Sequence, residues 1–180
     1  MAETHPTSAA RHVRISAAGA GTALVTVAIL ALVGWRLLYP YRIGPKQPVP
    51  FSHRVHAGDK RISCFFCHPF ADRGPSAGMP EVSTCLLCHN QIVPQFPPVQ
   101  KVHEFFANDE PVPWVRVTRL ADHVHFPHHM HLRKGVDCGR CHGDVKAMDR
   151  VLPAHRFKMG FCVDCHRAQK ASVDCLVCHY

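Results

Sequence analysis

The ten cysteines of the chain fall into five Cys-x-x-Cys pairs, and a histidine directly follows each pair. Numbered 1 to 5 in chain order, the motifs contain Cys64, Cys67 and His68; Cys85, Cys88 and His89; Cys138, Cys141 and His142; Cys162, Cys165 and His166; and Cys175, Cys178 and His179. In this pattern both sulfurs form thioethers to the vinyl groups of a haem, and the histidine binds its iron from one side. The sequence therefore predicts five covalently attached haems c, with no sulfur left for a disulfide or a free thiol.

Cys-x-x-Cys pairs have two other common uses in proteins. Motifs 1 and 2 alone have the C-x2-C-x17-C-x2-C spacing of a structural zinc site, and a single pair is also typical of redox-active thiols. Neither kind of site requires a histidine after every pair. The five following histidines therefore favour haem attachment.

Each iron has a second axial position, and the chain offers many ligands for it, with 16 histidines in 180 residues. Apart from the motif histidines and the two near the N-terminus, His5 and His12, the candidates are His53, His56, His103, His123, His125, His128, His129, His131 and His155. Thioether sulfur is the other suitable donor, which adds Met79, Met130, Met148 and Met159.

An internal repeat narrows this choice. Two stretches share Phe-x-His-x-x-His, followed after seven or six residues by a haem motif: "FSHRVHAGDKRISCFFCH" (51–68) and "FPHHMHLRKGVDCGRCH" (126–142). The repeat resembles the class III multihaem cytochromes c, in which the first histidine is the distal ligand of the next haem and the second binds a following haem. The resemblance implies His53 and His56 as distal ligands at motifs 1 and 2. It implies His128 and His131 as distal ligands at motifs 3 and 4.

The distal ligand at motif 5 follows less directly. Residues 126–179 resemble the trihaem members of the class, where a histidine just before the second motif of the three binds the last haem. The nearest equivalent in "AHRFKMGFCVDCH" is Met159. We therefore expect Met159 to be the distal ligand at motif 5, with His155 and Met148 as alternatives.

Four candidate histidines are left over by this assignment. We expect His125 and His129 to support the ligands around them, as hydrogen-bonded polar groups, without binding iron. The roles of His103 and His123 stay open.

An apolar stretch precedes the motifs and bears on their position in the cell. Residues 15–38 contain no charge except Arg36 and are long enough to cross a bilayer core of about 30 Å. The length of the stretch and the absence of a small-x-small cleavage site favour a retained anchor over a cleaved signal peptide. The flanking charges do not fix its orientation, but haem c is attached on the outer side of the cytoplasmic membrane. We therefore expect residues 1–14 in the cytoplasm and the haem domain on the periplasmic side.

The rest of the chain divides by composition. A linker with four prolines, expected to be extended, separates the anchor from a haem domain, within which a proline-rich connector without a motif either wraps the surface or docks a partner. These segments are the linker 39–50, the haem domain 51–180, motifs 1 and 2 in 51–90, the connector 91–123, and motifs 3 to 5 in 124–180.

Five haems crowd a domain of this size, whose radius of gyration is only about 14 Å. Their apolar faces must replace much of a side-chain core. We therefore expect a small domain, mostly coil with short α-helices, of the multihaem class III cytochrome type. Its core is dominated by haem, and one N-terminal transmembrane helix precedes it.

The net charge of +8 is a property of the polypeptide without its haems. Each oxidised haem with two ionised propionates and neutral axial ligands adds about one negative charge, which leaves roughly +3. Basic side chains are expected to pair with propionates. The charge therefore gives no reason to expect a nucleic-acid partner.

The whole arrangement resembles the pentahaem, singly anchored cytochrome subunit of alternative complex III. The residues that carry this resemblance are the anchor, "FSHRVHAGDKRISCFFCH", "LADHVHFPHHMHLRKGVDCGRCHGDVKAM" and "FKMGFCVDCHR". The resemblance implies a quinol:electron-acceptor oxidoreductase with integral membrane subunits that bind quinol, an iron-sulfur subunit and a monohaem cytochrome c. Electrons would pass on to a terminal oxidase or another acceptor.

The local chemistry agrees with a role in electron relay. Iron with two axial ligands has no open position for a substrate, so we expect no substrate-converting site in this chain. An alternative is a self-sufficient, membrane-anchored multihaem quinol dehydrogenase that feeds a periplasmic reductase. That protein would need its own quinol pocket beside a haem, and the sequence identifies none.

Overall fold

The computed structural model describes residues 17–180, and the chain divides into two compact units between Tyr39 and Pro40. The predicted cytoplasmic segment 1–14 and the first two residues of the predicted span lie outside the described residues.

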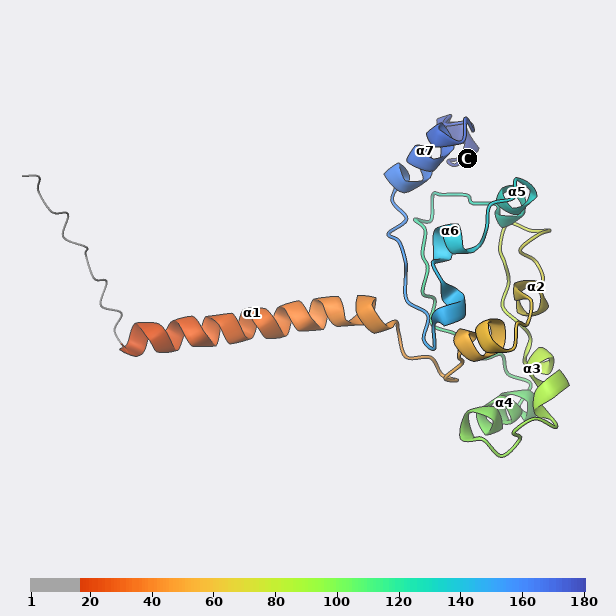
Figure 1. Cartoon of the computed structure of the whole chain (residues 1–180), viewed down its shortest axis with the longest axis horizontal. Helices are drawn as coiled ribbons and strands as arrows, with labels where there is room; N and C mark the ends of the chain where they lie inside the picture. The colour runs from red at the N-terminus through yellow and green to blue at the C-terminus, as the bar shows by residue number, and fades with distance from the viewer. Residues whose placement is uncertain (1–16) are drawn as a thin grey trace, which may run out of the picture. The chain divides into compact units, whose positions relative to one another are not determined.

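Helix α1 (Ala17–Ile43) contains the apolar stretch (Figure 1). Its segment Gly19–Leu37 has a mean hydropathy of 1.8 and none of it is buried, so its length and composition suit a membrane span. The helix continues past Pro40 and ends at Ile43. The expectation of an extended linker from residue 39 is therefore wrong for its first five residues, because the helix extends across a proline that usually marks a helix boundary. From Gly44 to residue 50 the linker has no regular structure.

The second unit consists of short helices joined by coil, and no strand occurs in residues 17–180. Its elements are η1 (Arg54–Asp59), α2 (Cys64–Cys67), α3 (Val82–His89), α4 (Pro97–Ala107), α5 (His128–Arg133), α6 (Gly139–His142), η2 (Val145–Ala147), α7 (Met159–Ala168) and η3 (Cys175–Val177). The expected fold class, short helices and coil with one N-terminal apolar helix, is confirmed.

Buried side chains are few. Among the described residues only Val49, Leu86, Val99 and Val102 are buried hydrophobics, and no side chain there is completely buried. These three valines and one leucine lie at or beside α3 and α4, where Phe105 and Trp114 also pack. A domain of this length ordinarily has a larger core. The polypeptide around the other helices therefore lacks the apolar packing that would hold it together by itself.

The connector contains one helix that the sequence reasoning did not expect. Helix α4 begins at Pro97, and its two prolines occupy the first turn, where a missing N–H costs no hydrogen bond. Val99 and Val102 are its buried residues, and α4 packs against α3. A high proline content is therefore compatible with a helix where the prolines lie in its first turn.

Candidate functional site

Every Cys-x-x-Cys-His motif forms one turn of helix. In motifs 1, 3 and 5 the histidine backbone N–H donates to the carbonyl of the first cysteine, at 2.8, 2.9 and 3.0 Å. Motifs 2 and 4 lie inside α3 and α7. Residues three and four apart share one face of a helix, so each turn presents two thiols and one imidazole to the same side. This is the arrangement that a haem bound by two thioethers and one axial histidine requires.

The imidazoles of four motif histidines are oriented by backbone carbonyls. Because a carbonyl only accepts, Nδ1 carries the proton in each case and Nε2 keeps its lone pair for a metal. The Nδ1–O distances are 2.8 Å for His68 to Gly78, 2.9 Å for His89 to Ile92, 2.6 Å for His166 to Ser172 and 2.9 Å for His179 to His123.

The carbonyl partners were missed by sequence reasoning, since a backbone oxygen carries no side-chain signal. At His89 the backbone next to its carbonyl partner has an unusual conformation. Val93, directly after Ile92, has a φ of 47°, in the left-handed region that β-branched residues rarely adopt. This turn follows α3 and lies beside the carbonyl that holds His89.

The two copies of the internal repeat have nearly the same local geometry. Phe51 lies edge-on to His53 at 4.9 Å and 88° and stacks on His56 at 4.3 Å and 27°. The equivalent contacts of Phe126 are 4.8 Å and 88° with His128, and 4.3 Å and 30° with His131. The phenylalanine of each copy thus fixes both histidines.

The second histidine of each copy is also held by its own turn. His56 Nδ1 donates to the Ser52 carbonyl at 2.8 Å, and His131 Nδ1 donates to the Pro127 carbonyl at 3.1 Å. Both acceptors lie four residues before the histidine. The Nε2 atoms are therefore the ones left for a metal in both copies.

Three of the predicted ligand pairs are brought together. Two imidazoles bound through Nε2 to one metal ion have centroids roughly 6 Å apart, because each metal–nitrogen bond is about 2 Å long. The measured centroid distances are 6.4 Å for His128 and His142, 6.0 Å for His56 and His89, and 6.0 Å for His131 and His166. The two rings of the first pair are within 4° of parallel. These spacings fit haem iron between the rings.

The fourth predicted pair is His53 and His68, and the pKa of His53 indicates that the two imidazoles lie near each other. Burial, followed by the imidazoles of His68 and His56, lowers the pKa of His53 to about 4. His53 is therefore neutral at pH 7, the form that binds a metal. Its Nδ1 atom is buried and has no hydrogen-bond partner among the described residues. The neutral imidazole keeps a lone pair for a metal, but its Nδ1 has no orienting carbonyl in the described chain, unlike the Nδ1 atoms of His56, His128 and His131.

At motif 5 the imidazole that contacts the motif histidine is not placed as a distal ligand. The His123 ring stacks on His179 at 5.4 Å and 24°, but the His123 carbonyl accepts from His179 Nδ1. The His123 backbone therefore lies on the Nδ1 side of the His179 ring. From there the His123 side chain is too short to reach the position across a metal ion from His179 Nε2. His123 therefore packs beside His179 and does not face its metal-binding nitrogen.

The three candidates for that position lie in different places. Met159 begins α7, is 70% exposed, and stands three residues before Cys162 on one helix face. Burial, followed by Cys178 of motif 5, raises the pKa of the Cys162 thiol, so this face lies near motif 5. His155 contacts Phe161 at 4.9 Å, and Met148 lies beside Gly143 in the region of motif 3. The placement of Met159 suits the prediction better than that of Met148.

The two histidines expected to be supporting residues contact neighbouring groups. His125 stacks on Tyr180 at 4.3 Å and 20°. His129 Nδ1 donates to the Gly74 carbonyl at 3.0 Å. His103, whose role was open, has its Nε2 buried without a partner among residues 17–180.

No group of three or more histidine, cysteine or acidic side chains in residues 17–180 is arranged to hold a bare metal ion. The imidazoles instead meet in pairs, and few side chains fill the space around them. Paired imidazoles beside turns with two thiols fit haem. The prediction that all ten cysteines become thioethers stays a prediction.

Gly143 directly follows His142, and a substitution there tests how closely the backbone of motif 3 packs against Ala154. Its φ of 71° and ψ of −168° are accessible only to glycine, and an added Cβ would lie 2.8 Å from the Ala154 Cβ. We expect Gly143→Ala to lower the free energy of unfolding by about 3 kcal/mol. Gly135→Ala is the control, because Gly135 has a φ of 73° but open space around it. That variant should lose only about 1 kcal/mol, measured by denaturant unfolding of the purified protein. Equal losses would show that the contact with Ala154 is unimportant.

A known protein is similar to this chain over most of the length of both. No family model matches the chain. The chain is similar to the "menaquinone reductase, multiheme cytochrome c subunit" of Nitratidesulfovibrio vulgaris, with 28% identity over an alignment that covers 89% of this chain and 90% of the relative. Together with the five motifs and their paired imidazoles, this similarity supports a multihaem cytochrome c.

Proposed function

We propose that this chain is a membrane-anchored pentahaem c-type cytochrome that relays electrons within a quinol:electron-acceptor oxidoreductase similar to alternative complex III. The observation that carries the proposal is the combination of five Cys-x-x-Cys-His turns with imidazoles paired at 6.0 to 6.4 Å.

In this proposal the ten motif cysteines attach the haems and the five motif histidines are the proximal ligands. A c-type haem with two axial ligands supplies one-electron transfer. The distal ligands at motifs 1 to 4 are His53, His56, His128 and His131. Met159 takes this role at motif 5, with His155 and Met148 as alternatives. Because side chains occupy both axial positions, the chain has no place to convert a substrate.

Helix α1 is the anchor of the proposed protein, with residues 1–14 in the cytoplasm and residues 51–180 on the periplasmic side. Its exposed apolar surface from Gly19 to Leu37 supports insertion in a membrane. The side follows from haem attachment, which takes place outside the cytoplasmic membrane.

The proposed partners are integral membrane subunits that bind quinol, an iron-sulfur subunit and a monohaem cytochrome c, with a terminal oxidase or another acceptor downstream. The relative, named as a subunit of a menaquinone reductase, supports membership in a quinone-linked complex. The anchor and the motif-bearing stretches support the likeness to alternative complex III in particular.

Quinol-driven reduction tests the proposal. Haem absorbance is followed after a quinol is added to the gently solubilised complex and, separately, to the purified single chain. We expect rapid haem reduction in the complex and none in the single chain, because quinol is oxidised in other subunits. Extraction of only a monomer that quinol does not reduce, with no partner recovered, would contradict membership in a complex.

A second candidate function, a self-sufficient anchored quinol dehydrogenase, is favoured by one observation. An open surface hollow of about 600 Å³ lies between α3 and α4. Its lining residues are Ser83, Leu86, Leu87, Asn90, Gln91, His103 and Phe106. In this candidate His103 accepts a proton from a quinol hydroxyl, because its Nε2 has no hydrogen-bond partner in residues 17–180. For this candidate, quinol reduces the single chain, and His103→Ala abolishes that reduction while the haem content is unchanged.

A further inference from the structure

Each haem attachment site has the number of its motif. The predicted distal ligands connect these sites in pairs. His53 and His56, assigned to sites 1 and 2, are three residues apart and touch the same Phe51 ring, at 4.9 and 4.3 Å. Sites 3 and 4 are linked in the same way through Phe126, at 4.8 Å from His128 and 4.3 Å from His131. Sites 1 and 2 are therefore neighbours, and so are sites 3 and 4.

The link between these pairs runs through the backbone after motif 1. The Pro75 carbonyl accepts from the backbone N–H of His128 at 3.2 Å and from its Nδ1 at 2.8 Å. The Gly74 carbonyl accepts from the backbone N–H of His129 at 3.3 Å and from its Nδ1 at 3.0 Å. The distal residue of site 3 is thus held by the segment that follows His68. Site 3 adjoins site 1, although motif 2 separates motifs 1 and 3 in the sequence.

The thiols agree with this arrangement. In four of them burial raises the pKa most, and a thiol of another motif raises it next. The affected thiols and their neighbours are Cys85 with Cys67, Cys138 with Cys64, Cys141 with Cys165, and Cys162 with Cys178. Each of these thiols therefore lies near a thiol of another motif: site 2 near site 1, site 1 near site 3, site 3 near site 4, and site 4 near site 5. The backbone N–H of His125 also donates to the Cys178 carbonyl at 2.9 Å, which holds motif 5 beside the second copy of the repeat.

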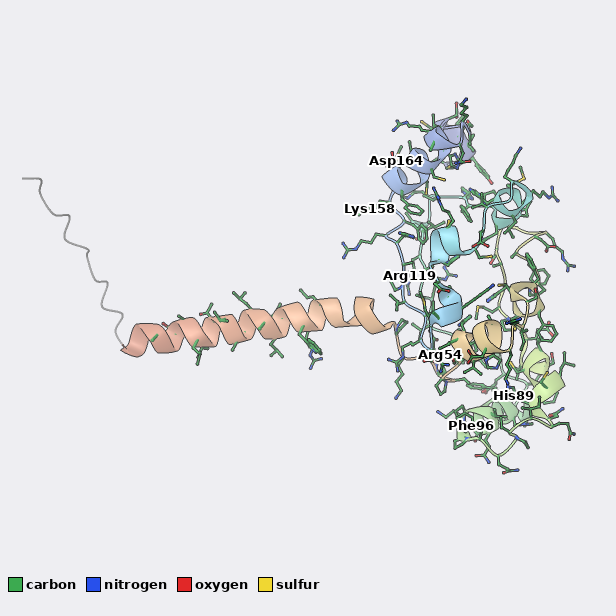
Figure 2. The ribbon with its side chains drawn as sticks, in the orientation of Figure 1. Arg54, His89, Phe96, Arg119, Lys158 and Asp164 are labelled. Atoms are coloured by element: carbon green, nitrogen blue, oxygen red, sulfur yellow. The ribbon has the colours of Figure 1, made fainter. Side chains whose placement is uncertain are left out.

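The ribbon agrees with this order for motifs 1 to 4 (Figure 1). Within the unit that begins at Pro40, Figure 1 places α3 near one end, α2 next, α6 beyond it, and α7 at the opposite end. Figure 2 shows the side chains of His89 and Phe96 at the first end and those of Lys158 and Asp164 at the other. Motif 2 is therefore terminal in space and internal in the sequence.

We propose that the five attachment sites form a linear series in the order 2–1–3–4–5. This inference rests on the proposed pentahaem function and adds the order in which electrons pass between the haems. The two ends of the relay are then site 2, beside α3 and α4, and site 5, at the C-terminus. Partner redox centres exchange electrons with the chain at these two ends, and site 1 is an internal member that bridges sites 2 and 3.

An experimental map of the intact haem-loaded protein tests the order through the five iron positions. We expect the iron of site 1 to have two near neighbours, at sites 2 and 3, and the iron of site 2 to have one. Iron 2 located between irons 1 and 3 would overturn the order while leaving the pentahaem proposal intact. Fewer than five haems would instead count against the proposed function.

A redox titration of His56→Met gives an independent test in solution. Methionine ligation raises the potential of haem 2, so this haem stays reduced while the others are titrated. A reduced neighbour disfavours reduction of the adjacent haem by charge repulsion. In the proposed order the midpoint of one other low-spin signal falls relative to the unmodified protein. A fall in two midpoints would show that site 2 has two neighbours and would contradict the order.

Discussion

Replacing Cys138 and Cys141 together by serine is expected to leave four covalently bound haems and a strongly destabilised protein. A serine hydroxyl forms no thioether, so motif 3 loses its attachment. The structure shows no conventional core near α6 that would compensate, because the buried hydrophobics of the described residues lie at or beside α3 and α4. Removing one buried aromatic side chain costs 3 to about 5 kcal/mol, and a haem is larger. We therefore expect a loss of at least about 5 kcal/mol in the free energy of unfolding.

The matched control is the same double substitution at Cys85 and Cys88. Helix α3 packs against α4 through Leu86 and Val102, so this region keeps some apolar packing without its haem. Both variants should contain four haems by intact mass, and the motif 3 variant should unfold at a lower denaturant concentration. Equal stability of the two would show that haem does not replace a side-chain core around α6.

The second large effect is expected at His128. His128→Ala removes the imidazole that lies 6.4 Å from His142 and nearly parallel to it, so one of the five haems should become high-spin. Alanine is favourable in a helix, and therefore α5 should persist. Added imidazole should restore the low-spin state by entering the vacated axial position. Electron paramagnetic resonance of the oxidised protein measures both changes.

His129→Ala is the control for this prediction, because His129 is the next residue in α5. Its Nδ1 atom is bound to the Gly74 carbonyl, and we expect it to hold the helix in place without binding iron. All five haems should stay low-spin in this variant. A high-spin signal from His129→Ala, together with none from His128→Ala, would reverse the two roles.

The parts of the site that the sequence predicted are those with a side-chain pattern. The five motifs determine where the thiols and proximal imidazoles stand. The Phe-x-His-x-x-His repeat predicted a shared geometry that the contacts of Phe51 and Phe126 reproduce to within 0.1 Å and 3°. Local pattern was sufficient here because a short helical turn places residues three and four apart side by side.

The remaining features depend on contacts between distant residues or on backbone atoms. The hydrogen bond from His128 to the Pro75 carbonyl spans 53 residues. Every residue has a backbone carbonyl, so the residue type at position 75 does not predict that this one is an acceptor. The order of the sites depends on such bonds, so it was not predictable from the order of the motifs. Helix α4 lies in the connector, where the sequence indicated only a surface wrap or a docking segment, because the proline count does not distinguish prolines in a first helical turn from prolines in coil.

The most direct test of the central claim combines the intact mass of the purified full-length chain with spin quantitation of its oxidised irons. We predict five covalently bound haems per chain, with low-spin, six-coordinate signals that account for all five irons. A mass that corresponds to fewer haems, or mainly high-spin, five-coordinate iron, would contradict the account.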